Sequence, residues 1–264
     1  MTEAEFKQLA AQGYNRIPVT LETFADLDTP LSIYLKLADR AWTYLLESVQ
    51  GGERFGRYSF IGLSAPTRIV AYGRNVMVLT GNRIAERRDD CDPLAFVGEY
   101  MGRFRLAPRA GLPRFCGGLA GYFGYDAVRY IEPRLAKTWK GGGIDTPDIL
   151  LLQCEELAVI DNLSGRLYLI VYADPSQSEA YSNAKRRLRD LKEQLKYSVS
   201  APVVKATQSY PPEREFAKAD YLRAVEQAKR LIEAGDVKDG VIKLASATFQ
   251  VVGVPPINVK VQKD

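Results

Sequence analysis

Short runs rich in Tyr, Val, Ile and Thr follow one another through the first third of this chain, and they constrain its fold more than any other feature. Glycine and other turn formers bound most of these runs. β-branched and aromatic residues favour strands, and strands spaced about 8–12 residues apart are typical of antiparallel sheets, whereas parallel sheets alternate strands with helices. The pattern therefore predicts antiparallel sheets. The expected strands cover residues 43–48, 57–62, 67–72, 76–80 and 83–88.

A long hairpin is expected further along the chain. Residues 149–160 and 166–172 are apolar runs, and the Asp-Asn-Leu-Ser-Gly segment at 161–165 has the composition of a turn. The adjacent pair Glu155 and Glu156 would then lie within one strand and point to opposite faces. Those two carboxylates therefore cannot act together as a general acid and base.

Capping signals mark the expected helix N-termini. Thr2 and Ser176 each precede a glutamate by three residues, which is the capping-box spacing. Prolines follow Thr29 and Asp92, at the position where a first helical turn tolerates them. The expected helices cover residues 3–12, 31–39, 93–103, 177–196 and 218–234.

The composition excludes several classes of protein. The chain has 264 residues, of which 46% are hydrophobic and 26% charged, as in an ordinary globular protein. No apolar run is long enough to cross a bilayer, no secretory signal is visible, and three cysteines are too few for a disulfide framework. We therefore expect a cytoplasmic protein with no membrane partner. The net charge is only +4, and the basic residues at 185–189 share a helix with acids, which indicates a solvated face and no nucleic-acid partner.

The chain contains no histidine, which limits the chemistry it can perform. Imidazole acid–base catalysis, histidine metal ligands and Ser-His triads are excluded. Three aspartates surround Cys91, but the glycine and the terminal glutamate of a calcium loop are missing there. Asp92 is therefore expected to cap a helix and not to bind a metal.

Several motifs resemble one family, and they occur in the same order. The run from Tyr44 to Gly62, YLLESVQGGERFGRYSFIG, is similar to the N-terminal signature of anthranilate synthase component I, the chorismate-using large subunit of an enzyme of tryptophan synthesis. Other similar segments lie at Asn15–Pro18, Asp28–Leu37, Gly117–Asp126, Pro147–Leu150 and Asp220–Asp236. The resemblance implies an α+β fold, an antiparallel β-sandwich of two packed sheets with flanking helices.

In that family the Leu-Leu-Glu-Ser stretch belongs to the allosteric L-tryptophan site, so L-tryptophan is the implied ligand. The implied site residues are Leu46, Glu47, Ser48 and Arg57. An amino-acid site needs acceptors for the ammonium, donors for the carboxylate and an apolar slot. Glu47 would accept from the ammonium, Ser48 would donate to the carboxylate, and Leu46 would wall the indole. Arg57 would pair with the carboxylate, or alternatively form a surface ion pair with Glu53. For Glu47 and Ser48 the alternative is an ordinary exposed strand end.

The family pattern breaks after Asp236. The segments that help to place magnesium in the family, one of which contains a histidine, are absent, and residues 249–253 resemble a later strand of the family. We therefore expect an internal deletion, with a regulatory domain at residues 1–200 and a linker, helix and remnant of the chorismate-binding domain at residues 201–264. Such a chain would have no cofactor and no catalytic or metal residue of its own, and alone it would be inactive.

The intact family enzyme converts chorismate to anthranilate with magnesium, and a glutamine amidotransferase subunit supplies ammonia. This chain would be the tryptophan-binding, feedback-regulatory portion of such an enzyme. Two alternatives stay open, a fragment similar to aminodeoxychorismate synthase and an engineered scaffold without a ligand. The continuation GGERFGRYSFIG favours anthranilate synthase over the first. The missing Asn-Pro-x-Pro-Tyr-Met segment, which closes over tryptophan in the family, favours the second.

Overall fold

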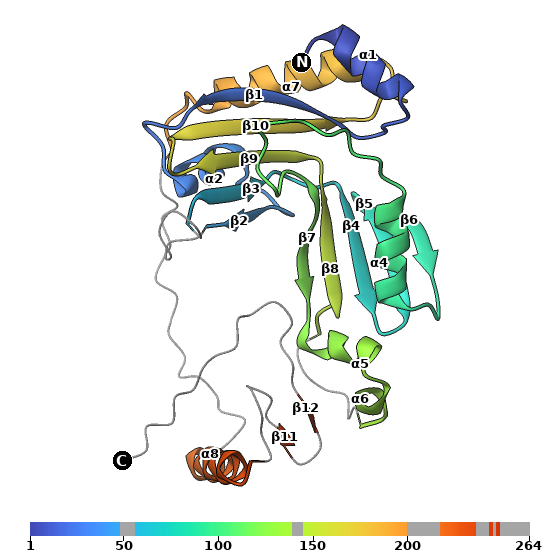
Figure 1. The fold of residues 1–264 in the computed structure, drawn as a ribbon, viewed down its shortest axis with the longest axis vertical. Coiled ribbons are helices and arrows are strands. Elements are labelled where there is room, and N and C mark those ends of the chain that lie inside the picture. Colours follow the sequence, from blue (N-terminus) through green and yellow to red (C-terminus); the bar gives the residue numbers. More distant parts are fainter. Residues whose placement is uncertain (48–55, 139–144, 200–216, 236–242, 245–246, 249–264) are drawn as a thin grey trace. The chain divides into compact units, whose positions relative to one another are not determined.

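The computed structural model describes residues 1–47, 56–138, 145–199, 217–235, 243–244 and 247–248 (Figure 1). Internal contacts divide the chain into two units. The first, here called the sandwich unit, comprises Met1–Ile131 and Gly143–Ala201, and the second comprises Glu132–Gly142 and Pro202–Asp264. The described elements of the second unit are α6 (Pro133–Thr138), α8 (Lys218–Glu233) and the short antiparallel pair β11 (Lys243–Leu244) and β12 (Ala247–Thr248).

The first sheet of the sandwich unit has five strands, and every neighbouring pair is antiparallel. In spatial order the strands are β1 (Ile17–Phe24), β10 (Arg166–Ala173), β9 (Glu156–Asp161), β3 (Tyr58–Gly62) and β2 (Tyr44–Leu46). The sequence pattern predicted β2, β3 and the β9–β10 hairpin, but it did not identify β1.

The second sheet also has five strands in antiparallel order. In spatial order they are β6 (Arg83–Arg88), β5 (Asn75–Thr80), β4 (Thr67–Tyr72), β8 (Ile149–Cys154) and β7 (Gly118–Phe123). A short 3₁₀ turn at Tyr125–Ala127 and helix α5 (Val128–Ile131) follow β7. The predicted antiparallel sheets are therefore confirmed.

The single strand expected at residues 149–160 is wrong. The chain leaves the second sheet after Cys154 and joins the first sheet at Glu156, so β8 and β9 belong to different sheets. Glu155 lies at this crossing, where its carbonyl oxygen accepts from the backbone N–H of Tyr172 at 2.8 Å. No glycine, proline or other turn former stands at the crossing, and for this reason the sequence did not reveal it.

Helices cover the outer face of each sheet (Figure 1). On the first sheet, α1 (Glu3–Ala11), α2 (Pro30–Leu37) and α7 (Ala180–Gln194) pack over a largely aliphatic core. On the second sheet, α4 (Pro93–Gly102) covers a smaller core with Phe96 and Tyr100. We call these two surfaces the helix-covered faces.

The other faces of the two sheets pack against each other. Leu157, Val159 and Ile170 of the first sheet share one cluster with Leu152 and Cys154 of the second. Half-buried aromatic side chains complete this cluster, among them Tyr44, Tyr58, Phe60, Phe115, Tyr168 and Tyr172. We call these surfaces the inner faces. Two packed antiparallel sheets with flanking helices confirm the predicted fold class.

Most of the capping predictions are confirmed. Thr2 and Glu5 form the expected capping box of α1, and Thr29 and Asp92 cap α2 and α4. The box expected at Ser176 is wrong, because α7 begins only at Ala180. The Asp174 carboxylate accepts from both the backbone N–H and the hydroxyl of Ser176, at 3.0 and 2.7 Å. This local turn holds the serine before the helix starts.

Candidate ligand cavity between the inner faces

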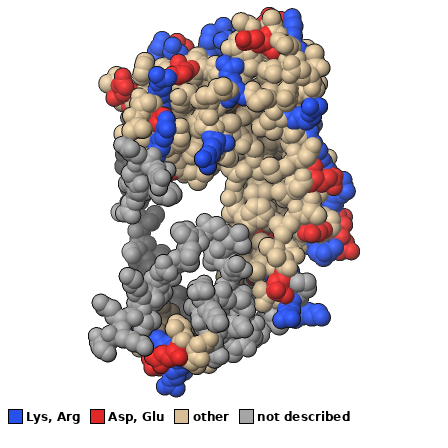
Figure 2. Space-filling model, in the orientation of Figure 1, with Lys and Arg blue, Asp and Glu red and all other residues tan. Residues whose placement is uncertain are grey.

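A cavity of about 560 Å³ opens between the inner faces of the sandwich unit. Sites for small molecules have volumes of about 300–1,000 Å³ and are mostly apolar. Its lining is dominated by apolar and aromatic side chains, namely Trp42, Thr43, Tyr44, Leu46, Phe60, Phe115, Leu119, Ala120, Gly121, Phe123 and Leu150–Leu152. The surface over β7 and β8 carries few charged side chains (Figure 2). The cavity therefore has the size and lining of a site for an apolar or aromatic ligand.

Strand alternation sets which residues of β2 reach the cavity. Tyr44 and Leu46 line it, whereas Leu45, between them, packs on the helix-covered core of the first sheet. Leu46 is the last residue of β2 and is 52% exposed, so it forms part of the cavity mouth. Of the three residues of β2, one side chain therefore packs in the helix-covered core and two line the cavity.

The ring of Tyr44 occupies the space above the opposite residue on β3 because that residue is a glycine. Tyr44 pairs with Gly62, and a Cβ atom at Gly62 would lie only 1.9 Å from the Tyr44 ring. The Tyr44 hydroxyl donates to the Sγ atom of Cys154 at 3.3 Å, which joins the two sheets beside the cavity. Burial raises the pKa of Tyr44 and the pKa of the Cys154 thiol, so both groups stay protonated at neutral pH.

A second glycine, Gly121, sets the distance between β7 and β8 in the part of the cavity wall that the second sheet supplies. A Cβ atom at Gly121 would lie 2.0 Å from the carbonyl oxygen of Leu150. Only glycine therefore allows β7 to approach β8 this closely. The lining residues Ala120 and Phe123 take their positions from this approach.

The structure places three of the four predicted ligand residues. Leu46 lines the cavity, and Glu47 follows directly after β2 with an exposed side chain. Arg57 lies just before β3 and does not line the cavity. Ser48 and the alternative ion-pair partner Glu53 lie outside the described residues.

Arg57 is held by a residue that the sequence did not single out as a partner. Its Nη2 atom donates to Asp161 at 2.9 Å, its Nε atom donates to the same carboxylate, and its guanidinium lies 4.9 Å from the Tyr58 ring centroid. The Asp161 side chain is only 3% exposed, and the hydrogen bonds from Arg57 hold the pKa of its carboxyl below the usual value. The neighbouring Asn162 donates to the carbonyl oxygens of Arg57 and Gly56. The β9–β10 turn therefore fixes the backbone where β3 begins.

Trp42 is a further cavity residue that sequence reasoning missed. Trp42 lies two residues before β2 and lines the cavity. Its backbone is left-handed, with φ of 63°. The guanidinium of Arg68 lies 4.1 Å from the centroid of its ring. No local sequence signal relates two residues 26 positions apart, so this pair emerges only from the fold.

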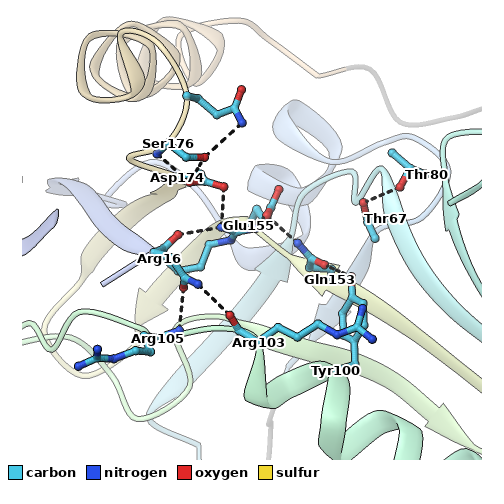
Figure 3. Close-up of polar contacts among 12 residues, drawn as sticks. Arg16, Thr67, Thr80, Tyr100, Arg103, Arg105, Gln153, Glu155, Asp174 and Ser176 are labelled. Atoms are coloured by element: carbon cyan, nitrogen blue, oxygen red, sulfur yellow. Dashed lines mark hydrogen bonds and ion pairs between the residues drawn. The ribbon is translucent and has the colours of Figure 1, made fainter. Parts of the chain in front are cut away.

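A second polar cluster lies where the two sheets meet (Figure 3). Arg16 pairs with Asp174 at 2.9 Å and with Glu155 at 3.3 Å. Gln153 donates to Glu155 at 2.7 Å and accepts from the Tyr100 hydroxyl at 2.6 Å. Every member thus has a partner in the cluster. The adjoining cavity measures only about 50 Å³, too small for an amino acid, so we interpret this cluster as a structural tie between the sheets.

The described part of the chain offers no metal centre. No group of three or more Asp, Glu, Cys or His side chains comes together there in a way that could hold an ion. None of the helices within the described ranges has the length and hydrophobicity to cross a membrane.

Comparison with known proteins finds similarity to one family of enzymes. A sequence model of the chorismate binding enzyme family matches residues 52–248. Anthranilate synthase component 1 of Neisseria meningitidis is 48% identical over 239 residues, which cover 89% of this chain and 48% of that protein. The Pseudomonas aeruginosa protein of the same name is 48% identical over 241 residues, covering 89% of this chain and 49% of that protein. The chain thus spans about half the length of the curated relatives it matches.

A similar solved structure is that of anthranilate synthase component I from Streptococcus pneumoniae. It has a TM-score of 0.49 and 23% sequence identity, and the match covers 81% of this chain and 46% of that chain.

Proposed function

Because this chain belongs to the chorismate-binding enzyme family and is a homologue of anthranilate synthase component I, we propose that its sandwich unit is a regulatory module that binds L-tryptophan. The ligand site is the cavity between the inner faces. The observation that carries this proposal is a largely apolar cavity of about 560 Å³ whose mouth includes Leu46, the residue directly before Glu47.

The apolar part of the ligand finds a matching lining. An aromatic side chain buries about 150–250 Å², which is worth roughly 4–6 kcal/mol at about 25 cal/mol per Å² before the costs of binding. Phe60, Phe115 and Leu46 supply the apolar and aromatic surface that such burial needs. An indole ring therefore suits the interior of the cavity, whereas a charged side chain would lose its hydration there.

The polar end of the ligand would lie at the mouth. Glu47 accepts from the ammonium group, and Ser48 donates to the carboxylate. Asp161 takes the Nε and Nη2 side of Arg57, whose side chain is 45% exposed, so the Nη1 edge is the part of the guanidinium that meets the ligand carboxylate. In this arrangement Arg57 contacts the ligand carboxylate from beside the cavity and does not form part of the cavity wall.

The same proposal separates regulation from catalysis. The conversion of chorismate to anthranilate, magnesium binding and the glutamine amidotransferase partner belong to the intact family enzyme. The sequence contains no histidine and lacks the family segments that place magnesium, so this chain alone does not turn over chorismate. Anthranilate fluorescence is the readout, with chorismate, ammonia and magnesium added to the pure protein. Product formation at enzyme-like rates would contradict the proposal.

Isothermal titration with L-tryptophan tests the binding site. Ser48→Ala removes a hydrogen bond to a charged carboxylate, worth about 1.5–3 kcal/mol, and should weaken binding about ten- to a hundredfold. Glu47→Gln removes the charge that recognises the ammonium and should also weaken binding. Glu47→Gln should not affect the melting temperature, because Glu47 is exposed and follows the last residue of β2.

The matched control is Glu193→Gln, which changes an exposed glutamate of α7 outside the cavity lining. Its affinity for L-tryptophan should equal that of the wild type. Binding that is unchanged by both Glu47→Gln and Ser48→Ala would place the ligand elsewhere. No binding by the wild-type chain would favour the scaffold without a ligand.

A further inference from the structure

Trp42 combines an unusual backbone with a place in the cavity wall. It is one of three non-glycine residues with positive φ in the described part of the chain. Left-handed conformations are costly for a residue with a bulky side chain, and such costs persist where the surrounding structure imposes them. Here the Trp42 carbonyl accepts from the N–H of Ala65 at 3.0 Å, which fixes the backbone on the inner side.

The ring of Trp42 is held as firmly as its backbone. The Arg68 guanidinium lies 4.1 Å from the ring centroid, within the range of a cation–π contact. Arg68 is itself only 8% exposed, and its Nη1 atom donates to the carbonyl oxygen of Gly81 at 2.9 Å. The cation is therefore anchored in the second sheet, and it holds a tryptophan that lies two residues before β2 of the first sheet.

Despite these restraints, Trp42 remains 42% exposed and lines the cavity. A residue needed only for packing would be expected to bury its ring. A rigid aromatic surface that is still partly uncovered can accept another aromatic ring without an additional loss of conformational entropy. Aromatic pairs gain from offset or edge-to-face contact beyond the area they bury.

We propose that Trp42, held by Arg68, is a specificity-determining residue of the cavity, which contacts the aromatic ring of the ligand and makes the site prefer a planar aromatic amino acid over an aliphatic one. This inference rests on the proposed function and adds to it a residue outside the Leu-Leu-Glu-Ser stretch. It assigns recognition of the ring to Trp42 and recognition of the ammonium group to Glu47, so the two roles can be tested separately.

Isothermal titration of the full chain with L-tryptophan and L-leucine provides the test. Trp42→Leu should weaken L-tryptophan binding about two- to tenfold, the loss expected for one aromatic pair, and should change L-leucine binding less than about twofold. The ratio of the two affinities should therefore fall. Trp42→Phe, which keeps an aromatic ring, should preserve more of the ratio than Trp42→Leu. A general loosening of the fold would weaken both ligands together and leave the ratio unchanged.

Two further variants keep the test decisive. Trp42→Gly tolerates the left-handed backbone, so it should fold even if Trp42→Leu does not, and it should lower the ratio as well. Tyr72→Leu removes an aromatic residue that is also 42% exposed but does not line the cavity, and it should leave both affinities unchanged.

The outcomes separate this inference from the proposed function. An unchanged affinity ratio in the Trp42 variants would overturn the inference. If Glu47→Gln still weakened L-tryptophan binding in that case, the proposed function would stand alone. A wild-type chain that binds no L-tryptophan would overturn both.

Discussion

The helix-covered faces and the inner faces of the same two sheets carry different chemistry. The largest fully buried side chains are all aliphatic, and those under α1, α2 and α7 include Ile17, Ile33 and Leu191. The inner faces also bury aliphatic residues such as Leu157 and Ile170, but they add half-buried tyrosines and phenylalanines and leave a cavity of about 560 Å³. Close packing of aliphatic groups supplies stability, whereas the incompletely filled aromatic space can admit a ligand. One strand can serve both purposes because its side chains alternate between the faces.

The largest expected effect comes from matched leucine truncations on the two sides. Leu191→Ala removes a fully buried side chain from the helix-covered core and should lower the free energy of unfolding by about 2–5 kcal/mol. Leu46→Ala, at the 52% exposed cavity mouth, should change it by only about 0.5 kcal/mol and should instead weaken L-tryptophan binding. Urea unfolding and titration measure the two quantities. Equal losses of stability would remove the distinction between the faces.

A smaller effect is expected from alanine at Gly121, which sets the distance between β7 and β8. The added methyl group would meet the Leu150 carbonyl oxygen at 2.0 Å, so β7 must move, at a cost of about 1–3 kcal/mol. Gly98→Ala is the control, because a Cβ atom at this position in α4 meets nothing within 4 Å. That change should be neutral or stabilise the protein by up to about 1 kcal/mol. A stable Gly121→Ala variant with an unaltered melting temperature would contradict the packing described for the cavity wall.

The pH dependence of stability should reveal the ion pair on the inner side. Hydrogen bonds from Arg57 lower the pKa of Asp161 in the folded state. Its stabilising contribution is therefore present above the unfolded value of about 4 and is lost as the pH falls through the folded pKa. Asp161→Asn should destabilise the protein at pH 7 by about 1–3 kcal/mol, with a smaller difference at pH 3. Urea unfolding at both values decides this, and a difference independent of pH would show that the carboxylate charge is not responsible.

The smallest expected effect concerns single hydroxyl groups on the two sides. Tyr44→Phe removes the hydrogen bond to Cys154 on the inner side, and Tyr181→Phe removes the 2.7 Å hydrogen bond from α7 to the carbonyl oxygen of Met1 on the helix-covered side. Each should cost about 0.5–1 kcal/mol, and only Tyr44→Phe should also alter L-tryptophan affinity. An affinity change in Tyr181→Phe of the same size would mean that binding responds to stability in general.

Local patterns predicted most of the strands but not the contacts between distant residues. The strand β1 was missed, although its IPVTLETF sequence alternates apolar and polar residues toward its C-terminal end. The crossing at Glu155 has no turn former to mark it. The ion pair of Arg57 with Asp161 joins residues 104 positions apart, and the stack of Arg68 on Trp42 also depends on tertiary structure. The sequence identified Leu46 as a site residue because it lies within a continuous motif, whereas most of its neighbours in the cavity come from distant segments of the chain.

A crystal structure of the chain grown with saturating L-tryptophan tests the central claim most directly. The account predicts electron density for the indole ring between the inner faces, in contact with Leu46 and Trp42, and density for the ammonium group on the side of Glu47. The helix-covered faces should keep their packing. A ligand bound elsewhere on the chain, or a cavity filled by its own side chains under these conditions, would contradict the assignment of binding to the inner faces.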